Sequence, residues 1–478
     1  MLSNAARATE PHDKALRINL DPTRYGTFAE IGAGQEVARW FFRVGGAAGT
    51  IAKSVSAYDM AVSDAIYGNV ARYVSRERLE AMLDHELDLN LQRLRETRGS
   101  TTAFFAFADT VSAQSYRGNR ECHGWMGVKF QSHPRDEASR ILIHVRMLDR
   151  ENALQQEALG ILGVNLLHGA CFHFHEPDQL IESLLDGLST HRLEIDMIEF
   201  SGIEFRHVDN RLMSMKLVEL GLSDAAMFGP RGQVLQPSEV LHKRPVVLAR
   251  GSFRPVSYSH LDILRSARES AEKQLSLRAG QDLVELAELT MRQLRGDRGQ
   301  VDRQDFLLRA DMLAAVGKTV LISDYFEFER LAAFIGRHTQ GRTAFVVGAG
   351  TLREIFDERL HPESEGAHLE AVAQLFKDGL TLYVYPLLDS KTGAVETASS
   401  FDPGERLRGL YRHVLDRGLV RALDNYDPER SAVFSRDVLE RIRLGDQRWE
   451  DMVPFEVGSL IRERRAFGFV PPAGKSAA

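Results

Sequence analysis

The stretch Pro245–Leu264, PVVLARGSFRPVSYSHLDIL, decides the fold of the second half of this chain. It opens with apolar residues typical of a buried strand, which we expect to end at Arg250. The turn Gly251–Pro255 follows, and a helix is expected to start near Ser257 or Ser259, either of which could cap it. A strand, a tight turn and a helix in this order place free backbone N–H groups where a phosphate can bind.

Outside this stretch, strand-like runs alternate with helical patterns along the whole chain. Strands are expected at 101–108, 140–146, 245–249, 319–322, 343–347 and 381–386. Mostly helical segments are expected at 76–96, 261–296 and 403–416. Alternation of this kind predicts an α/β fold with mainly parallel sheets. We expect a Rossmann-like sheet in the C-terminal half and a mixed α/β domain in the N-terminal half.

The length of 478 residues exceeds that of one typical domain. Turn-forming residues concentrate at 229–237, which makes this segment the expected boundary. The sequence therefore predicts an N-terminal domain of unknown role at 15–240 and a C-terminal domain at 245–469. The polar ends, 1–14 and 470–478, are expected to be disordered tails.

Composition and charge narrow the classes of partner. The net charge of −7 and the pI of 6.2 give no electrostatic reason to expect nucleic acid as a partner. No apolar run is long enough for a membrane span, and residues 1–14 lack the apolar region of a signal peptide. Two cysteines, Cys122 and Cys171, exclude a secreted disulfide framework and favour a reducing cytoplasm. The expected partner is a small molecule, and a homo-oligomer is one option for the assembly.

The stretch Gly251–His260 also resembles a known motif. Nucleotidyltransferases that make precursors of NAD, coenzyme A and related dinucleotides carry Gly-x-Phe-Asp/Asn-Pro-x-His-x-Gly-His. The matching positions of this chain are Gly251, Phe253, Pro255 and His260. At three positions the chain departs from the motif: Arg254 replaces the acid or amide, Ser257 the first histidine, and Ser259 the glycine.

Two further segments resemble the same family in the same order. Residues 345–352, FVVGAGTL, are similar to its FIIGAD-T-L strand end, with Gly350 in place of the aspartate. Residues 433–467 resemble its ISSTxxR helix and the ending that follows it. In this helix Phe434 replaces the first serine, Arg436 the threonine, and Leu439 the phosphate-binding arginine.

The resemblance implies a function for the C-terminal half. It implies Mg²⁺-dependent adenylyl transfer from ATP to nicotinate mononucleotide or a related phosphorylated small molecule, as in NAD biosynthesis. The whole chain is also similar to bacterial proteins of about its length that are labelled nicotinate-nucleotide adenylyltransferases. Gly251, Ser252 and Phe253 would form the phosphate turn, with Ser257 and Gly348 as further cofactor contacts. His260 would contact the phosphates, and Arg254, Arg436 and Arg441 could replace the lost positive charge.

The replaced motif residues leave a second hypothesis open. Adenylyl transfer depends on orienting two phosphates and on stabilising the charge of the departing pyrophosphate. With a histidine, an aspartate and an arginine of the motif missing, the chain could be a catalytically degenerate nucleotide-binding or scaffolding protein. On that hypothesis His260 packs at the start of a helix, and the arginines are solvated surface residues.

The N-terminal half carries a weaker glycine pattern in 27–42, TFAEIGAGQEVARWFF. We expect a strand to end at Ile31 and a helix to follow the turn that contains Gly32 and Gly34. This resembles the first half of a dinucleotide or S-adenosylmethionine loop, with Asp59 as a downstream acid and without the third glycine. A methyltransferase or dehydrogenase is the third hypothesis, and a purely structural turn is its alternative.

Two segments contain residue types that bind metals, and neither has the spacing of an established metal motif. If residues 168–176 formed a strand, Cys171, His173 and His175 would share a face and could hold zinc or iron. His168 lies in the same segment. The alternating phenylalanines equally fit an ordinary half-buried strand. Residues 196–210 form an acidic segment that could bind magnesium or simply be a solvated connection. We therefore predict no metal ligands.

Overall fold

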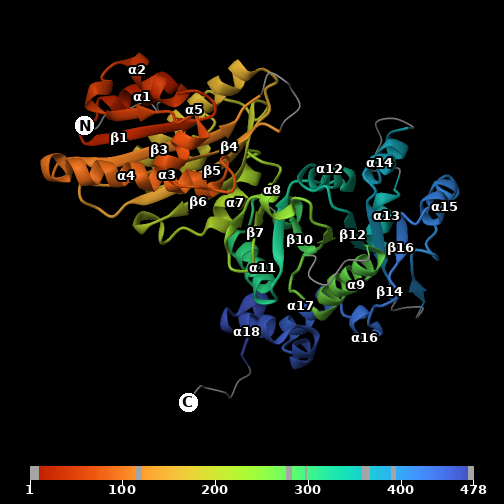
Figure 1. Ribbon diagram of the computed structural model, residues 1–478. Coiled ribbons are helices and arrows are strands. Elements are labelled where there is room, and N and C mark those ends of the chain that lie inside the picture. Colours follow the sequence, from red (N-terminus) through yellow and green to blue (C-terminus); the bar gives the residue numbers. More distant parts are fainter. Residues whose placement is uncertain are drawn as a thin grey trace. The chain divides into compact units, whose positions relative to one another are not determined.

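The computed structural model describes residues 10–114, 121–275, 282–295, 299–357, 366–388 and 394–471. The chain divides into two compact units, Met1–Ala226 and Met227–Ala478, here called unit 1 and unit 2 (Figure 1). Both are built from sheets and helices, which confirms the expected α/β class. No helix among the described residues is long and apolar enough to cross a membrane.

Unit 1 contains a six-stranded sheet in the order β2-β1-β3-β4-β5-β6. Strand β1 pairs in parallel with β2 and β3, whereas β3 to β6 pair antiparallel, so this sheet is mixed and not mainly parallel as the alternation of strands and helices predicted. The strands are β1 (Arg24–Ile31), β2 (Ile51–Val55), β3 (Ala103–Ser112), β4 (His123–Phe130), β5 (Ser139–Met147) and β6 (Leu193–Ser201).

Helices cover both faces of this sheet. Neighbouring residues of a strand point to opposite sides, so adjacent residues of β1 contact helices on different faces. Phe28 packs on Phe41 of α2, with ring centroids 4.9 Å apart, while the hydroxyl of Thr27 donates to Asn90 of α4 over 3.1 Å. Helices α1 and α5 pack with α2 on the first face (Figure 1). The helices are α1 (Pro11–Asn19), α2 (Glu36–Val44), α3 (Met60–Tyr67), α4 (Arg76–Arg98), α5 (Asn152–Phe172), α6 (Pro177–Glu182) and α7 (Asn210–Glu219).

Unit 2 contains an eight-stranded sheet in the order β16-β13-β12-β9-β10-β11-β7-β8. The pairs from β16 to β11 are parallel, and β7 and β8 form an antiparallel pair at one edge. The strands are β7 (Ala225–Phe228), β8 (Val234–Leu235), β9 (Val246–Arg250), β10 (Val284–Thr290), β11 (Thr319–Ser323), β12 (Thr343–Gly348), β13 (Thr381–Tyr385) and β16 (Val420–Ala422). A separate antiparallel pair joins β14 (Leu387–Leu388) to β15 (Val395–Glu396).

The helices of unit 2 lie between and after these strands. Leu264 and Ala267 of α9 pack on Val247 and Val346 of the sheet. The helices are α8 (Pro237–Leu241), α9 (Tyr258–Leu275), α10 (Met291–Leu294), α11 (Arg303–Ala315), α12 (Phe328–His338), α13 (Ala349–Ile355), α14 (Ala367–Leu375), α15 (Arg408–Asp416), α16 (Pro428–Ser431), α17 (Ser435–Leu444) and α18 (Phe455–Glu463).

The six expected strands and the helix expected at 76–96 are confirmed. The helix expected at 261–296 is wrong in part, because Val284–Thr290 forms β10 in the middle of the sheet. Its sequence, VELAELT, contains good helix formers, but burial between two parallel neighbours outweighs that propensity. Pro11–Lys14, expected in a disordered tail, opens α1, whereas residues 1–9 and 472–478 lie outside the described residues.

Strand β9 lies where the direction of winding in unit 2 changes. The next strands, β10 and β11, extend the sheet on one side, and β12, β13 and β16 extend it on the other. In open parallel sheets, ligands bind at the carboxyl ends of the two strands that flank such a switch point. Here those ends are Arg250 of β9 and Gly348 of β12. The Gly251 turn therefore follows a parallel strand at its carboxyl end, as the sequence predicts.

Candidate functional site

The turn after β9 is held by bonds to the neighbouring strand. The Gly251 N–H donates to the Glu288 carbonyl oxygen over 3.2 Å, so it is not the free phosphate donor that the sequence suggested. The Arg250 guanidinium donates to the buried Glu288 carboxylate over 2.8 and 3.0 Å and to two carbonyl oxygens of the loop after β11. Phe253 is buried with a φ of 45° and fills the inside of the turn. These bonds fix the turn, and Ser252 is its exposed residue.

His260 lies in the first turn of α9 and faces back toward this turn. Its Nδ1 accepts the Ser257 N–H over 3.1 Å and lies 3.0 Å from the Ser257 hydroxyl. The ring packs on Phe253, with centroids 4.8 Å apart, and burial lowers the pKa of His260 to about 4. Since Nδ1 is an acceptor and the ring is neutral at pH 7, the proton lies on Nε2. Nε2–H is therefore a hydrogen-bond donor.

Arg254, expected to supply positive charge, is engaged elsewhere. Its Nε donates to Asp305 over 2.7 Å, and its guanidinium lies over the Phe467 ring at 5.3 Å. Arg309 also pairs with Asp305 and donates to the Ser252 carbonyl oxygen over 3.2 Å. Asp305 is therefore shared between the two arginines, and Arg254 contributes to the support of the turn.

The carboxyl end of β12 is open. Gly348 ends the strand, and α13 begins at the next residue. A side chain built on Gly348 or on Gly350 would meet no atom within 4 Å. The open space at Gly350 is where the resembling family has an aspartate, so a ligand could approach this backbone closely.

Arg436 belongs to α17, which contacts the turn from the other side. The Ser435 hydroxyl donates to the Pro255 carbonyl oxygen over 3.2 Å. The Arg436 side chain is 87% exposed and lies 3.5 Å from Asp437. Arg441, another candidate cation of this helix, is paired with Asp446 at 2.6 Å. Arg436 is thus the exposed cation beside the segment that touches the turn.

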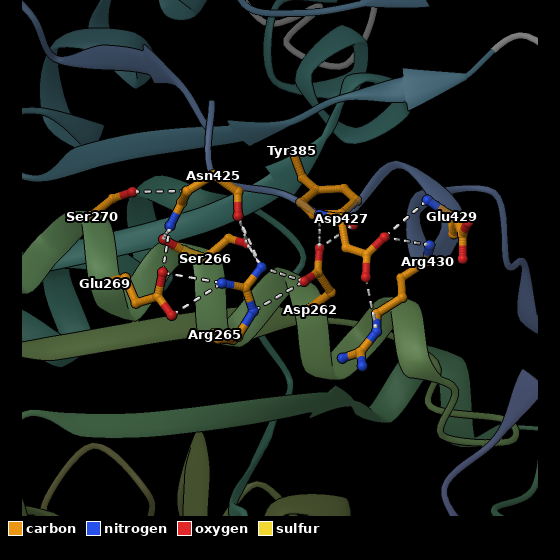
Figure 2. Close-up of polar contacts among 10 residues, drawn as sticks. All are labelled: Asp262, Arg265, Ser266, Glu269, Ser270, Tyr385, Asn425, Asp427, Glu429 and Arg430. Carbon is orange, nitrogen blue, oxygen red and sulfur yellow. Dashed lines mark hydrogen bonds and ion pairs between the residues drawn. The ribbon is translucent and has the colours of Figure 1, made fainter.

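A buried polar cluster connects α9 to the segment that leads into α16 and α17 (Figure 2). Asp262, with 0% exposure, accepts from Arg265 over 2.5 Å, from the Tyr385 hydroxyl over 2.7 Å and from the Asp427 N–H over 2.9 Å. Arg265 also donates to Glu269 over 3.0 Å and to the Asn425 carbonyl oxygen over 2.8 Å. These bonds bind the chain after β16 to the helix that carries His260.

This cluster was not predicted from the sequence. Its signal is the spacing of Asp262, Arg265 and Glu269, which places one acid three residues before and another four residues after the arginine on one face of a helix. The partners Tyr385 and Asp427 are distant in sequence, so the full cluster appears only in the folded unit.

A cleft of about 970 Å³ opens at the turn after β9. Gly251 and Ser252 form one wall, and the ends of β10 and β11 with α13 and α14 form the others. Its charged lining residues are Arg250, Arg292, Arg295, Asp324, Glu327, Glu329, Glu354 and Asp357. Its five carboxylates outnumber its three arginines, so a triphosphate would bind there only with a cation that compensates this charge.

The glycine turn of unit 1 has the expected shape, with φ values of 108° at Gly32 and 86° at Gly34. However, the carboxylate of Glu30 accepts the N–H groups of Val37 (2.9 Å) and Ala38 (3.0 Å) in the first turn of α2. Asp59, the expected downstream acid, caps α3 by accepting from the Val62 N–H over 3.0 Å. Both acids therefore have structural partners, and a carboxylate of the chain already occupies the anion position at α2.

The metal site considered at residues 168–176 required a strand, and the chain does not form a strand there. Residues Asn152–Phe172 form α5, so His168 and Cys171 lie on a helix and not on a strand with His173 and His175. Burial lowers the pKa of His168 to about 3 and raises that of Cys171 to about 11. Asp196, expected in a loop, is buried in β6. Among the described residues, no group of three or more His, Cys, Asp or Glu side chains is placed to hold a metal ion.

The fold and the site define an α/β protein of two units, the second of which has a Rossmann-like strand order and a turn at its switch point. No protein-family model matches the chain, and no curated protein is detectably similar in sequence. Solved structures give distant likenesses. A nicotinic acid mononucleotide adenylyltransferase from Plasmodium falciparum is 11% identical, with 48% of this chain and 98% of that chain covered and a TM-score of 0.30.

Two further solved structures show likenesses of the same kind. The competence/damage inducible protein CihA from Agrobacterium tumefaciens is 16% identical, with 33% of this chain and 93% of that chain covered and a TM-score of 0.24. A member of the competence-damaged protein (CinA) superfamily from Enterobacter cloacae is 15% identical, covering 36% and 98% of the two chains, with a TM-score of 0.24. At these identities and scores, the likenesses carry no information about function.

Proposed function

We propose that unit 2 binds ATP at the carboxyl edge between β9 and β12 and transfers its adenylyl group weakly or not at all. The observation that supports this most directly is the hydrogen bonding of His260. Because the Ser257 N–H fixes Nδ1 as an acceptor, Nε2–H remains as a neutral donor next to the turn. A phosphate oxygen is a suitable acceptor for such a donor.

Two neighbouring features support the same position. The space beside Gly348 and Gly350 allows a ligand to approach the start of α13 closely. Arg436 is exposed on the helix that contacts the turn through Ser435, so it can reach a phosphate without first breaking a buried ion pair. Mg²⁺ would arrive with the triphosphate, because no metal-binding group of side chains occurs among the described residues.

Turnover requires more charge stabilisation than these groups supply. The charge of Arg254 is compensated by Asp305, and Leu439 provides no cation where the resembling family has an arginine. Loss of one preorganised stabilising contact typically lowers a rate by roughly 10²–10³-fold. We therefore propose a nucleotide-binding role for unit 2. Efficient adenylyl transfer to nicotinate mononucleotide is the competing function, favoured by the motif resemblance.

Calorimetric titration of the full chain with ATP and Mg²⁺ tests binding. His260→Asn is the informative variant, because the asparagine Oδ1 can still accept the Ser257 N–H while the Nε2 donor is lost. We expect this variant to weaken ATP binding by about tenfold, the effect of one charge-assisted hydrogen bond. Full affinity in His260→Asn, or no ATP binding by the wild-type chain, would contradict the proposed site.

A pyrophosphate-release assay with ATP, Mg²⁺ and nicotinate mononucleotide tests turnover. We expect no release above background from the wild-type chain. Rapid release that His260→Asn abolishes would refute the degenerate site and establish a working transferase. S-Adenosylmethionine and NAD should be titrated in the same calorimetric series, because binding of either would support the hypothesis of a ligand site at the turn of unit 1.

A further inference from the structure

Unit 1 contains a hydrogen-bonded chain of three titratable side chains on three neighbouring antiparallel strands. The Asp196 carboxylate on β6 lies 2.6 Å from Nδ1 of His144 on β5. Nε2 of His144 lies 3.0 Å from Nδ1 of His123 on β4. Asp196 and His144 are 1% and 2% exposed, whereas His123, at the outer end, is half-buried. A hydrogen-bonded chain that runs from a buried carboxylate to a partly exposed histidine is arranged so that the outer histidine can accept a proton.

The carboxylate determines where each proton lies. An ionised aspartate is only an acceptor, so Nδ1 of His144 carries the proton of the 2.6 Å bond. In the neutral ring Nε2 of His144 is then an acceptor, and Nδ1–H of His123 donates to it. The remaining nitrogen, Nε2 of His123, holds a lone pair. The edge of the Trp125 ring packs against His144 at 5.0 Å and helps to keep that ring in place.

The surrounding charges define which substrate could approach. Arg146 of β5 lies next to His123 in register and pairs with Glu121 at 3.1 Å and with Glu194 of β6 at 2.6 Å. Among the described residues near His123, the carboxylates of Glu121, Glu194 and Asp196 outnumber the arginine. An anionic substrate is therefore disfavoured, and a neutral or cationic one is favoured.

We propose that His123 is the general base of a second site, in unit 1, which hydrolyses neutral or cationic acyl esters, with His144 and Asp196 as positioning residues. Nε2 of His123 takes a proton from water as the water oxygen bonds to the carbonyl carbon. The bond from that carbon to the leaving oxygen then breaks, and the departing alcohol receives the proton from His123. Ester and water become acid and alcohol, and His123 returns to its starting state.

The pKa of His123 agrees with this role. Burial, the neighbouring His144 and Arg146 lower it, whereas Glu121 and Asp196 raise it, and the net direction is below the ordinary value of 6.5. The imidazole of His123 is thus neutral, with its lone pair present, throughout the neutral range. The proposal concerns unit 1 alone and does not depend on nucleotide binding by unit 2.

Hydrolysis of p-nitrophenyl acetate by the full chain tests the activity. We expect His123→Gln to lower the rate by about 10²-fold, the lower end of the range for loss of a general base. The matched control is His133→Gln, because His133 forms an exposed ion pair with Asp136 in the same unit and measures the background reactivity of a surface imidazole. Equal rates for wild type and His123→Gln would overturn the proposal, as would an equal loss in His133→Gln.

Two further measurements separate a positioning role from a purely structural one. Nitrogen-15 spectra of the histidine rings should show both His123 and His144 with the proton on Nδ1, and an Nε2–H tautomer at His123 would refute the chain. Asp196→Asn should change the pH profile of hydrolysis, whereas Asp196→Glu should restore it in part. An unchanged profile in a folded Asp196→Asn protein would show that the carboxylate does not act through the histidines.

Discussion

Two turns in this molecule look alike in sequence and differ in what they offer a ligand. Each follows a parallel strand and precedes a helix, one at Gly32–Gly34 in unit 1 and the other at Gly251–Ser257 in unit 2. In unit 1 the first turn of α2 is occupied by the chain itself, because Glu30 accepts two of its N–H groups. In unit 2 the corresponding region presents His260, a neutral donor.

The comparison shows that a glycine turn before a helix does not by itself make an anion site. The residue that faces the start of the helix decides whether an anion can bind there. Glu30 brings its own carboxylate from the strand, and its buried neighbour Asp109, opposite it in register on β3, adds a second acid. A phosphate would have to displace Glu30 and would meet Asp109. In unit 2 the histidine offers a proton, so a phosphate would gain a bond.

The largest expected effect tests whether the turn of unit 1 is structural. Gly32→Val places a Cβ 1.9 Å from the Val111 carbonyl oxygen at a φ of 108°, so unit 1 should lose more than about 3 kcal/mol of stability or fail to fold. At Gly34 the φ is 86°, but the nearest atom to a Cβ is 3.7 Å away. Gly34→Val should therefore cost only about 1–2 kcal/mol of left-handed strain. Thermal unfolding of both variants checks the order, and a reversed order would contradict the described turn.

The next largest expected effect is a pH dependence of stability that the buried acids Glu30 and Asp109 of unit 1 cause. Burial raises the pKa of Glu30 from 4.5 to about 7, and burial with the adjacent Glu30 raises that of Asp109 well above its ordinary value. At these two groups the native state therefore holds more protons than the unfolded state between the unfolded and the folded pKa, so their contribution to stability is greatest in acid and falls as the pH rises toward 7. For Glu30 the loss is about 3 kcal/mol.

Asp109→Asn sharpens this test, because the amide oxygen can still accept the Ile31 N–H while the second acid is removed. We expect a smaller loss of stability between pH 5 and pH 8 than in wild type. Hydrogen exchange of peptides that cover β1 and β3 measures the change. Asp59→Asn, an exposed helix cap, is the matched control and should leave the pH dependence unaltered. An identical decline in wild type and Asp109→Asn would show that the acid pair does not control it.

The sequence predicted six strands of the two sheets, because each is an apolar run bounded by turn formers, but it gave no prediction for others such as β6 and β16. It failed at β10, where VELAELT contains strong helix formers and only its place between β9 and β11 decides the outcome. Of the site, the turn was predictable from the order of strand, turn and helix signals, and His260 was singled out only by the resemblance to the nucleotidyltransferase motif. The roles of Glu30, Asp305 and Asp262 were not, since each depends on a partner or neighbouring element that only the fold brings into contact.

The Asp196–His144–His123 chain shows more clearly that contacts between residues distant in sequence could not be predicted. The three residues are separated by dozens of positions, and Asp196 stands in an acidic segment that looked like a solvated connection. Antiparallel pairing of β4, β5 and β6, with a register shift between His144 and Val145 opposite β6, brings them together. No local pattern of the sequence encodes that arrangement.

The smallest expected effect concerns Arg254, and it tests whether the motif position or the actual contact determines a residue's role. By position Arg254 would touch a phosphate, but its bond to Asp305 and its contact with Phe467 make it part of the support of the turn. Its side chain is 39% exposed, so solvent weakens the ion pair. Arg254→Gln should lower stability by less than about 1 kcal/mol and leave ATP affinity within about twofold of wild type.

The matched variant for this test is Arg436→Gln. Arg436 is 87% exposed, and it pairs with its own neighbour Asp437, so its loss should not disturb the fold. If Arg436 contacts the phosphates, its replacement should weaken ATP binding severalfold and reduce the dependence of affinity on salt, because an exposed cation acts through a screened attraction. Calorimetry of both variants at low and high salt compares them directly. A larger loss of affinity in Arg254→Gln than in Arg436→Gln would mean that Arg254 leaves Asp305 when the nucleotide binds, and that the motif position outweighs the contact seen in the free protein.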